Sequence, residues 1–190
     1  MVTKSDLVSF LRSHPAIAKI NFSFGSFKVY PLAYRSDVAD AIDSGKVDLR
    51  IKPLPPPVAA SYDVLYDQLT IAPTFTFASI PDQALLVHES THIYLDILKI
   101  GWHSRYTNEA VAYLAEAVFL EAGGHAPRAP KSISAISHTI ARSILSGTYS
   151  VTPADVVLLS HAISTHPHYS TFPRYVSNAF DRDLLHNLLR

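Results

Sequence analysis

The residues best suited to chemistry stand close together in the middle of the chain. His88, Glu89 and His92 form an H-E-x-x-H pattern. Because residues four apart lie on one face of a helix, the two imidazoles can face a single metal ion. The carboxylate of Glu89 can reach a water bound to that ion, take its proton and pass it to a leaving amine. Imidazole and carboxylate ligands with one open position favour Zn2+ as the metal.

The residues around this pattern indicate that its helix is buried. Apolar side chains occur on most sides of the segment 82–100, namely Leu85, Leu86, Val87, Ile93, Leu95, Ile97 and Leu98. Polar groups buried there are costly unless they find partners, and a metal ion supplies them. The alternative is a pair of core histidines bonded to backbone carbonyls, with Glu89 in an ion pair.

A third protein ligand is expected from the helix that follows. Glu109 is preferred, because a second helix running back across the first could bring it near the two imidazoles. Glu116, about two turns further along, is the runner-up; if Glu109 binds the metal, Glu116 is expected to orient a ligand or contact the substrate. An ordinary alternative exists for Glu109, since a Glu in a first turn is stabilised by the helix dipole.

Asp96 has a different expected role. It lies about 12 Å along the helix axis from His88, too far to complete the ligand triangle. It fits better as a hydrogen-bond partner that orients His92. A solvated Asp near a helix end is the alternative.

The donor that would stabilise a negatively charged oxygen in the transition state is not fixed by any spacing rule. Six side chains in the surrounding loops are candidates: Tyr66, His103, Tyr106, His166, His168 and Tyr169. Tyr106 and His103 stand between the two helices and could also contact a substrate. Arg105 could bind a substrate carboxylate or face the solvent.

The segments that would position these groups predict a mixed α+β fold. Helical periodicity covers 4–13 and 36–44, and then 82–100, 107–122, 132–146, 153–164 and 181–189. Alternating apolar residues predict strands within 18–32, 47–51 and 59–77. We therefore expect one domain over 1–190, with a β-rich part at 1–81, a helical part at 82–190 and the H-E-x-x-H helix at the seam.

Two short motifs resemble those of the gluzincin metallopeptidases. His88-Glu89-Ser90-Thr91-His92 is followed by Thr107-Asn108-Glu109-Ala110, and in that family a downstream Glu, often within an Asn-Glu pair, completes the zinc site. The resemblance implies that His88, His92 and Glu109 are metal ligands and that Glu89 is the general base. Tyr113 stands where an Asp often follows the second motif.

The layout is also similar to compact zincin domains, including secreted, toxin-like bacterial ones. The segment from Tyr62-Asp63 to Thr70-Ile71 precedes the central helix. In zincins an edge strand at this place lies above the metal and pairs with an extended peptide. The resemblance implies a zincin-like fold and a peptide or protein substrate. Metal binding without turnover and hydrolysis of a non-peptide amide remain alternatives.

Composition narrows the classes of partner. The 190 residues carry a formal net charge of zero, which gives no reason to expect nucleic acid or an anionic membrane as a partner. Cys is absent, so neither disulfides nor thiolate metal ligands can occur. No segment is long and apolar enough to predict a membrane span, no signal peptide is visible, and the sequence does not indicate a localisation.

Overall fold

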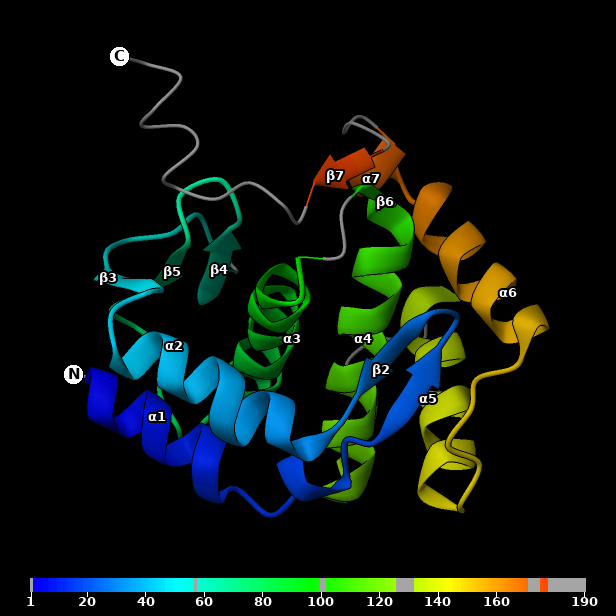
Figure 1. Cartoon of the computed structure of the whole chain (residues 1–190), viewed down its shortest axis with the longest axis horizontal. Helices are drawn as coiled ribbons and strands as arrows, with labels where there is room; N and C mark the ends of the chain where they lie inside the picture. Colours follow the sequence, from blue (N-terminus) through cyan, green and yellow to red (C-terminus); the bar gives the residue numbers. More distant parts are fainter. Residues whose placement is uncertain (1, 57, 100–101, 126–131, 171–174, 178–190) are drawn as a thin grey trace.

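Helix α3 (Ile80–Ile97), which carries the H-E-x-x-H pattern, runs through the centre of the molecule (Figure 1). The structure is a computed structural model that describes residues 2–56, 58–99, 102–125, 132–170 and 175–177. A small sheet and two N-terminal helices lie on one side of α3, and helices from the second half of the chain lie on the other. The mixture of helices and short strands confirms the expected α+β class.

The first part of the chain combines helices with short strands. In chain order its elements are α1 (Lys4–Ser13), the 3-10 turn η1 (Ile17–Lys19), β1 (Phe22–Phe24), β2 (Phe27–Val29), the π-helical turn η2 (Ala33–Val38), α2 (Ala39–Asp43), β3 (Asp48–Ile51), β4 (Ala60–Asp63) and β5 (Gln68–Ile71). The strands predicted within 18–32, 47–51 and 59–77 are present as β1 and β2, as β3, and as β4 and β5, but helices share this part of the chain. It is mixed rather than β-rich.

The second part of the chain is mainly helical. After α3 come β6 (Trp102–Ser104), α4 (Arg105–Ala122), α5 (Ser132–Leu145), α6 (Pro153–Ser164), α7 (Pro167–Ser170) and β7 (Tyr175–Ser177). The helices predicted over 107–122, 132–146 and 153–164 correspond to α4, α5 and α6. The helix predicted over 181–189 lies outside the described residues.

Strand β4 forms the edge of the sheet that faces α3. The strand order is β3-β5-β4, with β3 parallel to β5 and β4 antiparallel to it. In β4, Tyr62 is the partner of Leu69, and its backbone N–H donates to a side chain of α3 instead of to β5. The sheet therefore places one strand edge directly against the H-E-x-x-H helix.

Local sequence signals explain where several helices begin. Thr3 caps α1 and exchanges hydrogen bonds with Asp6 in a capping box. Ser79 caps α3 and Pro81 occupies its first turn, where the missing N–H costs little. Thr152 caps α6 in the same way, as its Thr-Pro-Ala-Asp sequence predicts.

Three boundaries differ from the sequence-based expectation. The helical segment predicted over 36–44 already begins at Pro31, since proline suits a first helical turn. Residues 74–77, which look strand-like, form turns, and Phe75 is buried in the core instead of pairing in a sheet. Helix α4 begins after Ser104, so Thr107 lies inside it and does not cap it.

One hydrophobic cluster joins both parts of the chain, with members from Leu7 to Tyr169. Tyr34 of η2 is fully buried within it, and its hydroxyl lies 2.8 Å from the hydroxyl of Thr91 in α3. Thr91 also donates to the carbonyl of Val87 at 2.8 Å. This contact fixes the side of α3 that packs against η2. None of the described helices combines the length and apolar character needed to cross a bilayer.

Replacing Tyr34 by Phe should lower the free energy of unfolding by about 1 kcal/mol, because a buried hydrogen bond to Thr91 is lost while the ring still fills its site. Urea denaturation followed by circular dichroism measures this. Tyr149→Phe is the control, since its side chain is exposed, and it should change stability by less than about 0.5 kcal/mol. Equal effects of the two substitutions would contradict the role of the buried hydroxyl.

Candidate metal centre

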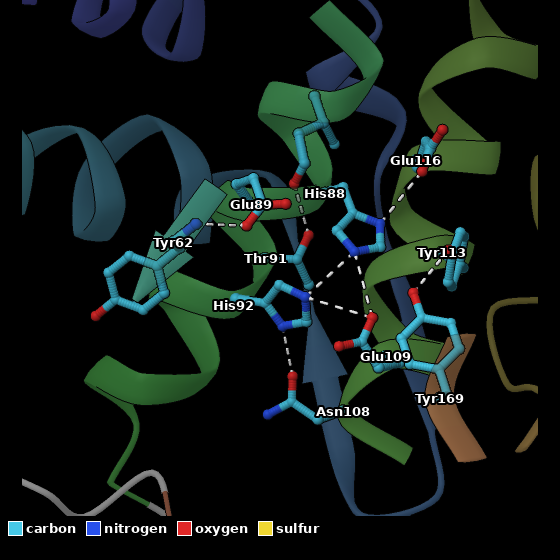
Figure 2. Close-up of polar contacts among 11 residues, drawn as sticks. Tyr62, His88, Glu89, Thr91, His92, Asn108, Glu109, Tyr113, Glu116 and Tyr169 are labelled. Carbon is cyan, nitrogen blue, oxygen red and sulfur yellow. Dashed lines mark hydrogen bonds and ion pairs between the residues drawn. The ribbon is translucent and has the colours of Figure 1, made fainter. Parts of the chain in front are cut away.

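Three side chains from two consecutive helices converge on one point (Figure 2). His88 and His92 come from α3 and Glu109 from α4. The two Nε2 atoms are 3.2 Å apart, and Glu109 Oε2 lies 3.6 Å from Nε2 of His88 and 3.8 Å from that of His92. A triangle with these sides has its centre about 2.1 Å from each corner, which matches zinc–nitrogen and zinc–oxygen bond lengths. The spacing of the three atoms therefore suits a metal ion.

A partner behind each imidazole turns its Nε2 toward this point. Nδ1 of His92 lies 2.6 Å from Oδ1 of Asn108, an oxygen that can only accept, so this nitrogen donates and Nε2 is left with its lone pair. Nδ1 of His88 lies 3.2 Å from Oε2 of Glu116. Such partners fix the tautomer and orientation of metal-binding histidines. Glu116 thus lies behind a ligand and not within the triangle.

The buried carboxylates of the site favour a positive charge beside them. Burial would raise the pKa of Glu109, but His92, His88 and Arg105 outweigh it and hold that pKa at about 2. Burial would lower the pKa of His88, yet hydrogen bonds with Glu109 and Glu116 keep it well above its ordinary value. A proton on His88 and a metal ion have the same electrostatic effect, because each compensates the negative charge of the buried carboxylates. A divalent ion in place of this proton would also accept lone pairs from the three atoms of the triangle.

Glu89 lies beside the triangle on the side of β4. Its Oε2 accepts the backbone N–H of Tyr62 at 2.7 Å (Figure 2). Burial raises the pKa of Glu89, and the neighbouring His88 and His92 oppose this rise. The Glu89 carboxylate points toward the edge of β4, and Glu89 is not one of the three residues whose atoms could hold a metal ion.

Asp96 does not orient His92, contrary to the expectation from the sequence. It is buried, and its carboxylate accepts the hydroxyl of Tyr62 at 2.7 Å. The same hydroxyl lies 3.3 Å from Asp67, in the turn between β4 and β5. Asn108 takes the place expected for Asp96, because it directly precedes Glu109 on α4 and so faces the same helix.

The triangle opens into a cavity of about 630 Å³, within the usual range of ligand pockets. Strand β4, the helices α3, α4 and α5, and the short helix α7 all contribute to its wall. Among the expected donors, His168 and Tyr169 line it, as does Arg105. The hydroxyl of Tyr169 lies 2.8 Å from that of Tyr113, whose ring stacks edge-on against His88.

The other candidate donors lie elsewhere. Tyr66 is 60% exposed on the turn between β4 and β5. Tyr106 packs against the hydrophobic core. His166 contacts the ring of Tyr169 and does not line the cavity. His103 belongs to β6, and its side chain falls outside the described part of the structure.

Sequence reasoning missed Tyr62 and the orienting role of Asn108. Asn108 had a signal, because it adjoins the expected ligand Glu109. Tyr62 had none, since its contact with Glu89 depends on how a strand docks against a helix 27 residues away.

Comparisons with protein-family models, with curated proteins and with solved structures gave no match.

Replacing Asn108 by Ala should weaken zinc binding about 10- to 100-fold, because His92 loses the acceptor that orients it. Competition with a chromophoric chelator measures the affinity. Asn21→Ala changes the same residue type in a part of the chain that does not line this cavity, and it should leave the affinity unchanged. Equal affinities for wild type and Asn108→Ala would show that the hydrogen bond does not support metal binding.

Asp96 should make stability fall as pH rises. Burial, opposed by the hydrogen bond from Tyr62 and reinforced by Asp67, raises the pKa of Asp96 from 3.8 to about 7, while Lys99 lowers it. The folded state then holds a proton that the unfolded state has lost, so the contribution is complete below about pH 4 and is lost as pH rises through about 7. Asp96→Asn cannot titrate there.

The measurement is the free energy of unfolding of wild type and Asp96→Asn between pH 4 and pH 8, with metal removed by a chelator. The difference between the two proteins should change progressively in favour of the variant across that range. A difference that stays constant with pH would contradict the raised pKa of Asp96.

Proposed function

We propose that this chain is a zinc metallopeptidase of gluzincin-like character with a zincin-like fold. One observation carries the proposal. Nε2 of His88, Nε2 of His92 and a carboxylate oxygen of Glu109 form a triangle of metal-binding size, and Glu89 stands beside it in an open cavity. A purely structural metal site would not need a carboxylate next to its ligands or an open cavity in front of them.

Each residue of the site has a distinct part in this proposal. His88, His92 and Glu109 would hold the ion. Glu116 would orient His88, and Asn108 would orient His92. When bound, zinc would lower the pKa of a coordinated water and polarise a carbonyl group. Glu89 would accept the proton of that water and deliver it to the leaving amine. Tyr169, which lines the cavity and pairs with Tyr113, would donate to the developing negative oxygen.

The shape of the cavity supports a peptide or protein as substrate. Its wall includes Ser61 and Tyr62 from the edge strand β4, Val64 from the turn that follows, and the candidate metal ligands of α3 and α4. An extended chain can lie beside such an edge while one of its carbonyl groups reaches the ion. The edge strand against the H-E-x-x-H helix is also the feature that supports a zincin-like fold.

The test is zinc content together with cleavage of casein and a peptide library. Glu89→Gln should retain zinc and lose at least about a thousandfold in kcat, since the proton acceptor is removed and the ligands are not. Glu109→Ala should lose zinc, because only two protein ligands remain. Glu121→Gln is the matched control: it bonds His138 and Arg142 and is not one of the three ligands, so both properties should be kept.

Other outcomes separate the alternatives. A wild type that binds zinc and cleaves no peptide would overturn the peptidase, and it would point to a binding domain or to hydrolysis of a non-peptide amide. A wild type that binds no zinc would overturn every function based on the triangle. Full zinc affinity in Glu109→Ala would move the third ligand to another residue.

A further inference from the structure

The general base proposed above is held by an edge strand and not by its own helix. Glu89 accepts the backbone N–H of Tyr62 at 2.7 Å. Tyr62 also reaches α3 a second time, because its hydroxyl donates to Asp96 at 2.7 Å. Glu89 and Asp96 are seven residues apart, so they lie on one face of α3 and about 10.5 Å apart along its axis. One residue of β4 therefore bridges two turns of the H-E-x-x-H helix.

We infer that Tyr62 is a positioning residue for Glu89: its hydroxyl anchors β4 to Asp96, and the anchored strand aims its backbone N–H at the Glu89 carboxylate. The inference rests on the proposed function, because Glu89 matters in this way only if it is the base. It also changes the expected use of the strand edge. The N–H of Tyr62 is committed to Glu89 and is not available to pair with a peptide substrate while that contact lasts.

The surroundings of Tyr62 show that its anchor is specific. Strand β4 is bonded to β5 on one side only, so its other edge is held in place by contacts with α3. The phenol is largely buried, and its hydroxyl lies nearer Asp96 than Asp67, at 2.7 Å against 3.3 Å. The single hydroxyl proton therefore goes to Asp96. An acceptor at position 96 is what the anchor needs, and a negative charge there is not required.

Substitutions in the 190-residue, zinc-loaded chain test this. Tyr62→Phe removes only the hydroxyl, and Asp96→Leu removes the acceptor. Asp96→Asn keeps an acceptor oxygen and should rescue the anchor. Tyr66→Phe is the matched control, since it changes an exposed tyrosine on the same hairpin.

Kinetics on a cleaved peptide give the first readout. Tyr62→Phe and Asp96→Leu should each lower kcat about tenfold to a hundredfold with little change in KM and with zinc content unchanged, because the base is misaimed while binding is kept. The double variant should be no worse than either single one, since both break the same bond. Asp96→Asn and Tyr66→Phe should remain within about twofold of wild type in kcat.

Amide hydrogen exchange gives a readout that does not depend on activity. The Tyr62 amide should be protected in wild type and should exchange at least about tenfold faster in Tyr62→Phe, Asp96→Leu and Glu89→Ala. An active wild type whose kcat survives Tyr62→Phe would overturn the positioning role. Fast exchange of the Tyr62 amide in wild type would overturn the contact itself. Protection without any peptidase activity would uphold the clamp and overturn only the proposed reaction.

Discussion

The burial of several carboxylates beside two imidazoles is the constraint on which this structure depends. Glu89, Glu109 and Glu116 all lie within reach of His88 or His92, between α3, α4 and β4. Charges removed from water need compensation, and hydrogen bonds alone do not provide it. Against the effect of burial, hydrogen bonds with Glu109 and Glu116 raise the pKa of His88, which favours a proton there. A metal ion at the triangle would compensate the buried negative charge more completely, since it would accept lone pairs from His88, His92 and Glu109 at once.

The central part of the site could be predicted because it depends on local geometry. The spacing of His88 and His92 places both imidazoles on one face of any helix they share, whatever surrounds it. Glu109 follows from a short connection between two helices that pack against each other. Helix starts such as Thr3 and Thr152 could be predicted for the same reason, because a capping side chain bonds the backbone only three residues away.

What could not be predicted depends on how distant segments dock. The contact of Tyr62 with Glu89 requires the position of an edge strand relative to α3, and the pairing of Tyr113 with Tyr169 joins residues 56 apart. Asp96 shows the same difficulty. Its place along α3 was evident, but the side of the helix that β4 covers was not, so its partner proved to be Tyr62 and not His92.

Some segments of the cavity wall are close to one another in the sequence and others are far apart. This difference influences the order in which the parts of the site form. All three candidate metal ligands lie within the segment from His88 to Glu109, on consecutive helices that pack together. The wall opposite β4 needs α7, which is made much later in the chain. Contacts between near neighbours in sequence form at lower entropic cost than distant ones. The candidate metal triangle would therefore assemble while the cavity is still open, and the arrival of Tyr169 would complete the wall around it.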